Sequence, residues 1–389
     1  MSKITLDNSL LSQLALDLDG ELHYDSLMKT LYATDASVYR ALPTAVALPK
    51  SNADIKKLID FATSNNLSLI PRTAGTSLAG QCVGEGIVVD VSKYLNKIIE
   101  FNKEEGWVRV QPGVVRNELN NYLKEFGYFI TSTATRAMVG GMVGNNSCGT
   151  TSIVYGSTRE HVLELKVLLS DGSEAVFKSL TADEFELKCK EESLEGELYR
   201  HVREELSQPE IQDNIRENFP KSTIHRRNTG YALDYLLESQ IFSDKNAPFD
   251  FCKLLCGSEG TLAITTEIKI HLDPLPDPYD IVVAAHFTSI HDSMKAAQVA
   301  MNEKPTAVEL MDKKILDCTK ENVEQSKNRD FVEGDPMAIL MVEFRGKTIE
   351  EANAQGAAFI AALKKVGLGY AYPIIGPERT SSAWNLRSA

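Results

Sequence analysis

The chain has 389 residues, 43% of them hydrophobic and 24% charged, which is typical of a folded globular protein large enough for two or more domains. Its formal net charge is −13 and no local basic patch offsets it, so nucleic acid is excluded as an expected partner. No run reaches the roughly 18 apolar residues of a membrane helix. The first 21 residues lack the features of a signal peptide, and we expect a cytoplasmic protein.

The cysteines and histidines give no sign of a metal site. Six cysteines contain no C-x-x-C pair and seven histidines contain no H-E-x-x-H, the spacings typical of iron–sulfur and zinc sites. We therefore expect no metal in this chain and free, mostly buried thiols. The cysteines are Cys82, Cys148, Cys189, Cys252, Cys256 and Cys318.

The first predicted helix covers residues 51–62, where Ser51 and Asp54 form a capping-box pattern. A strand at 67–71, a glycine-rich loop and a strand at 87–91 follow, so the chain from 46 to 91 is α/β in character. The apolar residues at helical spacing are Ile55, Leu58, Ile59 and Ala62.

A second amphipathic helix is predicted to stop at Gly127. Beyond residue 160 the pattern changes to strands, with a hairpin that turns at Asp171-Gly172, and these features predict an antiparallel sheet. Residues 181–218 are rich in Glu and Lys at helical spacing and are interpreted as a solvated helical insertion. One later strand is predicted to bury alternate residues, namely Leu262, Ile264, Thr266, Ile268 and Ile270.

The segment DPLPDP at residues 273–278 is interpreted as a domain boundary. The strands and helices expected after it follow the order βαββαβ, which predicts a ferredoxin-like arrangement. We predict three regions, an N-terminal helical arm at 1–45, a first domain at 46–275 and a second at 276–389.

Two loops are rich in small residues. PRTAGTSLAGQ begins at residue 71, and TSTATRAMVGGMVGNNSCGTTSIVYG spans residues 131–156. Such loops let backbone N–H groups surround a phosphate, although a surface turn is the alternative for either loop alone. The first loop lacks both the P-loop Lys-Ser/Thr and the nicotinamide fingerprint. Two loops of this kind suggest a long ligand.

These loops, together with CGSEGTLAITTEI at residues 256–268, resemble the FAD-binding domain of the vanillyl-alcohol oxidase/p-cresol methylhydroxylase superfamily. Within it, the chain is similar to the branch that contains glycolate oxidase, D-lactate dehydrogenase and D-2-hydroxyglutarate dehydrogenase. The resemblance implies an α+β chain. A PCMH-type FAD-binding domain, made of a small α/β subdomain and an antiparallel-sheet subdomain, precedes an incomplete ferredoxin-like cap.

The resemblance implies that both loops wrap FAD, and it also exposes departures. Thr73 and Ala74 replace a Gly-Gly pair, which narrows the allowed backbone geometry while Gly75 keeps its freedom. Members with covalent flavin carry His where this chain has Thr76, so FAD is expected to be non-covalent. Cys148 is interpreted as a packed thiol rather than a thioether site.

The implied FAD-binding residues fall in the two loops and three shorter segments. They are Pro71, Arg72, Thr73, Ala74, Gly75, Thr76, Ser77, Gly80, Gln81, Gly113, Ser132, Thr133, Gly140, Gly141, Gly144, Asn145, Asn146, Cys148, Gly149, Gly156, Glu259, Gly260 and Ile264.

The resemblance implies oxidation of a D-2-hydroxy acid to a 2-oxo acid, with FAD performing the redox step. Arg suits a substrate carboxylate because its guanidinium can donate two parallel hydrogen bonds to the two carboxylate oxygens. Arg387, in a family-like W-x-x-R, and Arg227, beside NTGYALD, are the candidates, each weighed against an ordinary solvated Arg. Glu259 is expected to order the FAD loop rather than act as a base.

Family members continue past W-x-x-R into segments with metal ligands and a catalytic base, so we expect the chain to be the front portion of a longer protein. The electron acceptor is expected to be a quinone, a cytochrome or an iron–sulfur module. Peripheral membrane contact through a quinone and a homo-oligomer stay open. Two rival hypotheses are a flavin-binding fragment without turnover and a cell-wall enolpyruvyl reductase, which lacks segments like VELMD and WNLR.

Overall fold

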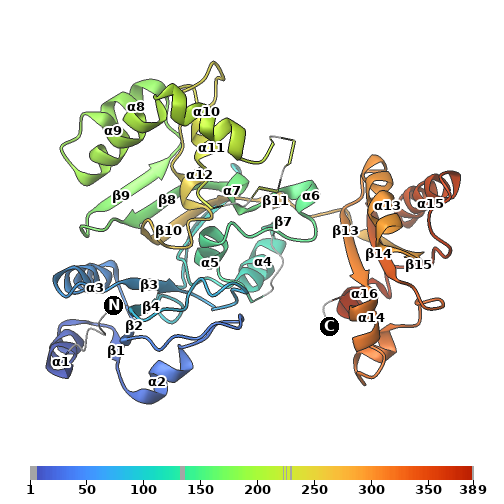
Figure 1. Cartoon of the computed structure of the whole chain (residues 1–389), viewed down its shortest axis with the longest axis horizontal. Coiled ribbons are helices and arrows are strands. Elements are labelled where there is room, and N and C mark those ends of the chain that lie inside the picture. Colours follow the sequence, from blue (N-terminus) through green and yellow to red (C-terminus); the bar gives the residue numbers. More distant parts are fainter. Residues whose placement is uncertain (1–6, 132–135, 222, 225, 228–229, 388–389) are drawn as a thin grey trace. The chain divides into compact units, whose positions relative to one another are not determined.

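The computed structural model describes residues 7–131, 136–221, 223–224, 226–227 and 230–387 (Figure 1). It divides into two compact units. The first unit comprises Met1–Gly149 and Gly156–Pro274, and the second comprises Thr150–Tyr155 and Leu275–Ala389. The main division therefore lies inside the DPLPDP segment.

The first unit begins with a small α/β layer. Its sheet has the order β1 (Glu21–His23), β2 (Ala45–Leu48), β4 (Ile87–Asp90) and β3 (Leu69–Arg72). Strands β2, β4 and β3 are parallel, whereas β1 is antiparallel to β2. Helices α1 (Asn8–Asp17), α2 (Ser26–Leu31) and α3 (Asn52–Ser64) belong to this region, and α1 and α3 supply apolar side chains to the core of the sheet. The α/β prediction for residues 46–91 is confirmed.

Helix α3 buries the predicted face, but its capping differs from the prediction. The Ser51 hydroxyl accepts a hydrogen bond from the Asp54 N–H at 3.3 Å. The buried Asp54 carboxylate accepts instead from the backbone N–H groups of Asp19 and Lys50, each at 2.9 Å. A reciprocal capping box is therefore wrong here, because neighbouring backbone donors take up this short acidic side chain.

The second layer of this unit is a five-stranded antiparallel sheet. Its order is β5 (Ile98–Asn102), β6 (Trp107–Val110), β10 (Ile264–His271), β8 (Val162–Leu168) and β9 (Glu174–Lys178). Every second residue of β10 from Ile264 is buried, as predicted. Leu262 is 38% exposed. Its assignment to the buried face is wrong because it lies in the bend before the strand.

The segment predicted as a solvated insertion is helical but only partly solvated. It forms α8 (Ala182–Cys189), α9 (Leu194–Leu206) and α10 (Pro209–Asn218), which lie beside the five-stranded sheet in Figure 1. Phe185 and Tyr199 are buried and pack against Phe249 with ring centroids 4.7 and 5.9 Å away. The charged composition hides these aromatic contacts, so the solvated interpretation is wrong for one helical face.

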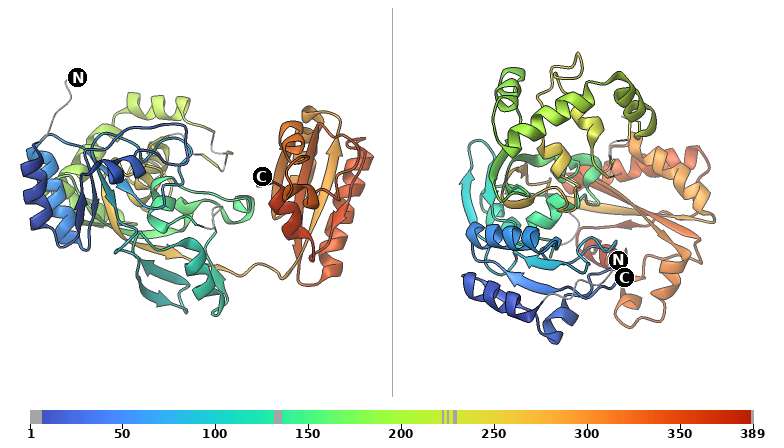
Figure 2. Two further views of the ribbon diagram at one scale, coloured as in Figure 1. Left: turned by 90° about the horizontal axis from the view of Figure 1, so that it is seen from below. Right: turned by 60° about the vertical axis from the view of Figure 1, so that its left-hand side comes forward.

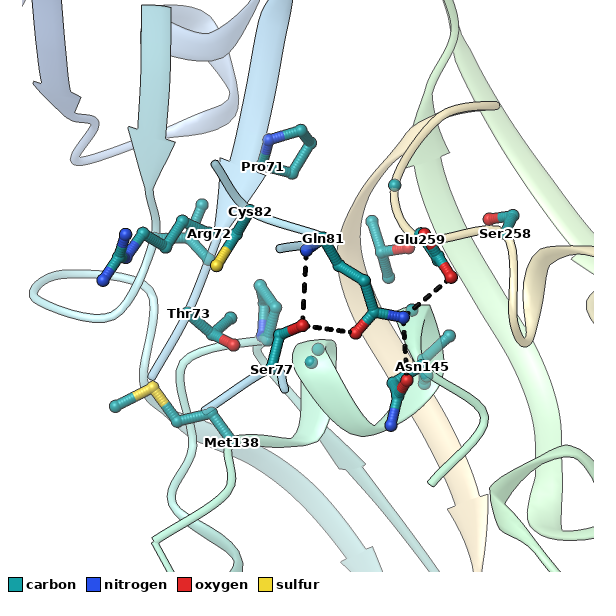
Figure 3. Close-up of a pocket in the computed structure, with 18 of the residues that line it drawn as sticks. Pro71, Arg72, Thr73, Ser77, Gln81, Cys82, Met138, Asn145, Ser258 and Glu259 are labelled. Atoms are coloured by element: carbon teal, nitrogen blue, oxygen red, sulfur yellow. Dashed lines mark hydrogen bonds between the residues drawn. The ribbon is translucent and has the colours of Figure 1, made fainter. Parts of the chain in front are cut away.

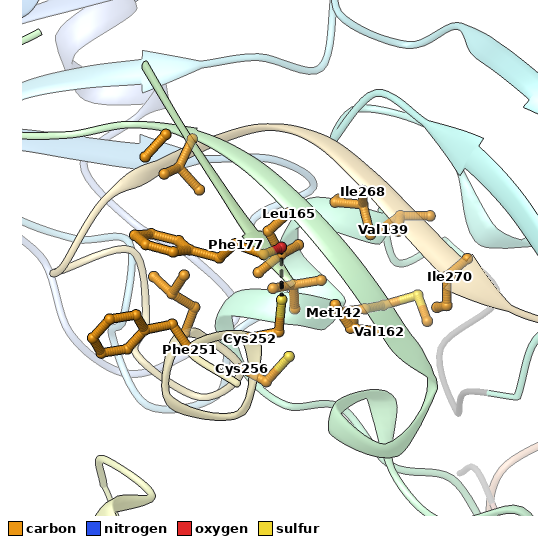
Figure 4. Packing of buried hydrophobic residues seen from close by; sticks show 14 of the residues in the cluster. Val139, Met142, Val162, Leu165, Phe177, Phe251, Cys252, Cys256, Ile268 and Ile270 are labelled. Carbon is orange, nitrogen blue, oxygen red and sulfur yellow. Dashed lines mark hydrogen bonds between the residues drawn. The ribbon is translucent and has the colours of Figure 1, made fainter. Parts of the chain in front are cut away.

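The main core of the first unit anchors the helix of the second glycine-rich loop. Val139 and Met142 of α5 (Val139–Gly144) pack with Ile268, Ile270 and Cys252, as Figure 4 shows. This burial fixes α5 through its apolar side chains and leaves its glycines for another surface. The remaining elements of the unit are α4 (Arg116–Lys124), β7 (Tyr128–Phe129), α7 (Thr158–His161), α11 (Leu233–Leu237), α12 (Cys252–Leu255) and β11 (Asp273–Pro274).

The second unit has an antiparallel sheet in the order β13-β14-β12-β15, which is the ferredoxin-like order expected from βαββαβ. Helices α13 and α15 pack on one face, and α14 and α16 pack on the other (Figure 2). The elements are α6 (Ser152–Tyr155), β12 (Tyr279–Phe287), α13 (Ile290–Asn302), β13 (Ala307–Asp312), α14 (Lys313–Cys318), a 3-10 turn η1 (Gln325–Asn328), β14 (Ala338–Gly346), α15 (Ile349–Lys365), β15 (Ile374–Ile375) and α16 (Thr380–Arg387).

The thiols agree with the sequence expectation. All six cysteines are free, four of them buried, with Cys148 partly buried and Cys318 exposed.

Candidate cofactor site

A cavity in the first unit lies where three segments meet. These are the first glycine-rich loop, helix α5 with the turn after it, and the residues from Leu255 to Thr265. It encloses about 1000 Å³ of space between protein atoms, which includes open solvent.

The first loop leaves β3 and offers its backbone to the cavity. Gly75 has φ +64°, a left-handed conformation that glycine adopts without strain. Among the described residues, the backbone N–H groups of Gly75, Thr76 and Ser77 donate to no protein acceptor. Exposed donors of this kind suit an anionic group such as a phosphate.

The second loop brings its backbone close to the first. A Cβ atom on Gly140 would lie 2.5 Å from the Pro112 Cβ, and one on Gly141 would lie 2.6 Å from the Thr73 Oγ1. On the third segment, Gly260 has φ +73° and lies against Pro71. Side chains at these glycines would close the space, so the three segments form a cradle lined by backbone.

Gln81 joins the three segments through its side chain (Figure 3). Its amide nitrogen donates to the Asn145 Oδ1 at 2.9 Å and to the Glu259 Oε1 at 2.7 Å. Its amide oxygen accepts from the Ser77 hydroxyl at 2.7 Å. Residues separated by 64 and 178 positions are thereby held at one point.

Glu259, on the third segment, has an unusual backbone conformation. It adopts φ +58°, which is unusual for a residue with a side chain, and its N–H donates to the Gly144 oxygen at 2.8 Å. This turn couples the third segment to the end of α5. The role of Glu259 in ordering the FAD loop stays a prediction.

Charged and titratable groups are few at the cavity. Arg72 donates a hydrogen bond from its Nη1 to the backbone oxygen of Thr34 at 2.9 Å. Its guanidinium lies 5.0 Å from the ring centre of Tyr32. The Cys82 thiol faces Asp35, and burial raises its pKa, which keeps it neutral near pH 7. Of the described residues that line the cavity, Glu259 is the sole carboxylate.

The predicted cofactor residues divide into three groups. Ser132 and Thr133 lie outside the described residues. Those that line the cavity are Pro71, Arg72, Thr73, Gly75, Thr76, Ser77, Gln81, Gly140, Gly141, Gly144, Asn145, Glu259, Gly260 and Ile264. Those that do not line it are Ala74, Gly80, Gly113, Asn146, Cys148, Gly149 and Gly156.

Several residues outside the cavity support its walls. Gly113 is enclosed by backbone, since a Cβ there would lie 2.7 Å from the Leu95 oxygen. The buried Asn146 accepts at its Oδ1 from the Ser157 hydroxyl and the Arg159 N–H, both at 2.9 Å. Tyr39 packs against Gly80. These residues position the loops.

Some lining residues were missed by the sequence reasoning. Pro112 stands next to the predicted Gly113. Seven others lie inside the segments 131–156 and 256–268 that carried the resemblance, so these segments were a usable signal for Ala137, Met138, Val143, Ser147, Ser258, Ala263 and Thr265. Cys82, Val91 and Leu255 follow from packing alone.

Arg227 belongs to the first unit and is largely buried. Its side chain is 10% exposed and forms an ion pair with Asp234 at 3.1 Å. The guanidinium lies 4.5 Å from the ring centre of Tyr235, whose ring is also 5.1 Å from the guanidinium of Arg159. Arg159 donates to the backbone oxygens of Lys253, Arg227 and Cys256 and so fixes this region.

Arg387 belongs to the second unit and closes α16. Its side chain is 38% exposed and forms an ion pair with Glu309, a residue of the VELMD segment, at 2.9 Å. The two predicted carboxylate-binding arginines therefore lie in different units, and each has an acidic partner. Their role in substrate binding stays a prediction.

Two family models match the chain, one in each unit. The FAD binding domain matches residues 43–177, and the C-terminal domain of FAD linked oxidases matches residues 277–389.

The chain thus combines an FAD binding domain with the C-terminal domain of FAD linked oxidases.

FAD is accordingly the cofactor of this chain, and the backbone cradle fits it. N–H donors without a protein acceptor suit its phosphates, and the glycine contacts leave room where side chains would obstruct it. The match to both domains does not support the expectation of a front portion of a longer protein.

The chain is similar to curated relatives that are much longer. It is 36% identical to the D-2-hydroxyglutarate dehydrogenase of Pseudomonas putida over 89% of this chain and 34% of that protein. It is 33% identical to the D-2-hydroxyglutarate dehydrogenase of Escherichia coli over 88% of this chain and 34% of that protein. The chain thus spans about a third of the length of these relatives.

A solved structure supports the fold of the chain. Alkyldihydroxyacetonephosphate synthase superposes with a TM-score of 0.63 at 14% identity, covering 98% of this chain and 67% of that one. In the described part of the chain, no helix is both long and apolar enough to cross a membrane.

Proposed function

We propose that the chain holds FAD non-covalently in the cavity and oxidises a D-2-hydroxy acid to the 2-oxo acid. The observation that carries the proposal is the backbone cradle of the first unit, within an FAD binding domain that precedes an oxidase C-terminal domain. The similarity to D-2-hydroxyglutarate dehydrogenases makes D-2-hydroxyglutarate the first substrate to test. D-lactate and glycolate are the alternatives.

The chain's own residues would bind FAD and orient the substrate. FAD, when bound, would supply the redox chemistry, since a flavin can take up the α-hydrogen of the hydroxy acid as a hydride. The N–H groups of Gly75, Thr76 and Ser77 are placed to hold phosphate oxygens, and Gln81 keeps the three walls together. A guanidinium such as that of Arg387 or Arg227 would hold the substrate carboxylate through its fork.

A second function is a flavin-binding chain without turnover of its own. The hydroxyl proton must leave to a base, and the sole carboxylate lining the described cavity, Glu259, is held by Gln81.

Anaerobic stopped-flow mixing separates the two functions. The FAD-loaded chain is mixed with D-2-hydroxyglutarate, D-lactate or glycolate, and the loss of flavin absorbance is followed. The L-enantiomers of the two chiral acids, 2-hydroxyglutarate and lactate, are the controls. We expect bleaching by the D-acids. Bound flavin that no acid bleaches would favour the alternative, and a chain that binds no FAD would contradict both functions.

The mode of attachment has its own test. Thr76 lines the cavity where covalent family members carry His, and a threonine hydroxyl does not form that bond. We expect acid precipitation to release all flavin into the supernatant. Yellow, fluorescent pellet protein would contradict non-covalent binding.

The electron acceptor is proposed to be a quinone, a cytochrome or an iron–sulfur partner. After anaerobic reduction, adding a soluble quinone analogue, cytochrome c or a ferredoxin in turn tests which of them reoxidises the flavin.

A further inference from the structure

Two carboxylates of the second unit lie on the sheet face that α16 covers. Glu309 on β13 is two residues before Met311, and Glu343 on β14 is two residues after Met341. Both methionines belong to the core that contains Leu386 of α16. Because side chains alternate along a strand, both carboxylates are on the α16 face.

Glu343 holds the helix in place. Its carboxylate is almost fully buried and accepts from the Thr306 hydroxyl at 2.8 Å, the Arg345 Nε at 2.8 Å and the Trp384 Nε1 at 3.2 Å. These contacts fix the middle of α16 one turn before Arg387. The backbone position of Arg387 is thereby set without any contribution from Glu309.

Glu309 then sets the direction of the Arg387 side chain. One carboxylate oxygen, Oε2, accepts from both Nε and Nη2 of Arg387, at 3.2 and 2.9 Å. This contact occupies one edge of the guanidinium. Among the described residues, Nη1 has no acceptor, and the Arg387 side chain remains 38% exposed.

An exposed ion pair of this kind adds little to folding stability, but it removes rotamer freedom from a long side chain. A carboxylate that meets an oriented guanidinium loses less entropy on binding than one that must order it. The outer edge formed by Nη1 and Nη2 still offers two parallel N–H donors for bidentate binding.

We propose that Glu309 is a positioning residue, which holds the guanidinium of Arg387 by its inner edge so that the outer edge receives the carboxylate of the substrate. This inference rests on the proposed function, because it takes the ligand to be a 2-hydroxy acid. Glu309 does not touch the substrate. Its negative charge opposes the incoming carboxylate, and its geometry compensates for that repulsion.

Charge and geometry can be separated by substitution at one position. Glu309→Gln keeps an acceptor oxygen at the same reach and removes the repulsive charge. Glu309→Asp keeps the charge and withdraws the acceptor by one methylene. Arg387→Met removes the proposed site, and Glu321→Gln is a matched control, since Glu321 is an exposed carboxylate of the same unit with no hydrogen bond or ion pair among the described residues.

Calorimetric titration of the FAD-loaded chain, whose flavin is first reduced anaerobically so that the acids bind without reacting, measures the effect with D-2-hydroxyglutarate and with D-lactate. We expect Arg387→Met to raise the dissociation constant at least tenfold and Glu309→Asp to raise it about three- to tenfold. Glu309→Gln should bind as tightly as the original chain or more tightly. Flavin-reduction rates at saturating acid should change less than the dissociation constants in both Glu309 variants.

Folding is checked separately through Trp384. The chain has two tryptophans, so in a Trp107→Phe background the emission reports α16 alone. The emission maximum should be the same in this background and in its Glu309→Gln and Glu309→Asp derivatives. A red shift in both derivatives would mean that Glu309 docks the helix, which would overturn a positioning role.

Each binding result decides between hypotheses. Unchanged affinity in Glu309→Asp, with weakened binding in Arg387→Met, would overturn the role of Glu309 while the proposed function stands. Unchanged affinity in Arg387→Met, in a chain whose flavin the acids reduce, would show that the carboxylate binds elsewhere. If no D-2-hydroxy acid binds to the original chain or reduces its flavin, the proposed function fails and this inference fails with it.

Discussion

The two glycine-rich loops of the cavity are built in different ways. The first, residues 72–82, has little regular structure, and the side chains of Ser77 and Gln81 hold it. The second contains α5, whose apolar residues are buried in the main core and whose glycines touch Pro112 and Thr73. One loop is thus held by polar side chains and the other by packing.

This difference assigns a different task to each loop. The first loop keeps free N–H groups because no helix or strand uses them, and it can adapt to an anion. The second loop is rigid and sets how closely the walls approach. Substitutions in the second loop should therefore block the cavity, whereas substitutions in the first should loosen it.

The largest expected effect is at Gly140. In Gly140→Val the new side chain would begin 2.5 Å from the ring of Pro112, and the core behind α5 prevents a retreat. We expect no flavin to stay with the protein after gel filtration, as measured by absorbance. Wild-type flavin content in Gly140→Val would contradict a rigid second loop.

The next effect is at Gln81, which joins both loops to Glu259. Gln81→Leu keeps the size of the side chain and removes its three hydrogen bonds to side chains. At about 0.5–1.5 kcal/mol for each bond, FAD should bind about tenfold to a thousandfold more weakly. Fluorescence titration with FAD measures this loss. Wild-type affinity in Gln81→Leu would mean that the first loop keeps its shape without the bridge.

A smaller effect, which a second substitution should reverse, is expected where Gly141 of the second loop lies against Thr73 of the first. In Gly141→Ala the new methyl group would lie 2.6 Å from the Thr73 hydroxyl, which can rotate away, so we expect FAD affinity to fall roughly threefold to tenfold. Thr73→Gly removes that hydroxyl. The double variant should recover most of the affinity in the same titration, and strictly additive losses would show that the two loops do not meet here.

The smallest effect concerns the support behind the second loop. His161 contacts the Ser157 oxygen at 2.9 Å and the Asp273 carboxylate at 2.8 Å. Burial lowers the pKa of His161, but the hydrogen bonds to Asp273 and Ser157 outweigh burial and raise that pKa above 6.5. Protonated His161 thus stabilises the fold below its unfolded pKa, and this contribution is lost as pH rises through the raised folded value.

We expect His161→Gln to lower the free energy of unfolding by about 1 kcal/mol at pH 5.5 and by less at pH 8.5. Urea titrations at both pH values measure the difference, with His291→Gln, an exposed histidine of the second unit, as the control. A larger loss at the higher pH would contradict a stabilising protonated His161.

Sequence patterns predicted features that depend on neighbours along the chain. The buried face of α3 and the alternation in β10 follow from the geometry of one helix and one strand. The capping of α3 did not follow, since Asp54 meets the N–H of Asp19, 35 residues away. The aromatic contacts of Phe185 and Tyr199 were hidden for the same reason, because their partners lie far along the chain.

The cavity shows the same limit. Small residues indicated both loops, because a segment without bulky side chains can expose its backbone to a ligand. Which glycines line the cavity was decided by packing, so that Gly140 faces Pro112 while Gly113 is enclosed by the Leu95 oxygen. The bridge from Gln81 to Asn145 and Glu259 needed three distant segments in register, and the pairing of Arg387 with Glu309 needed α16 docked on the sheet. The amino-acid sequence alone determines local periodicity and residue size. Contacts between residues far apart in the sequence form only once the core has brought their segments together.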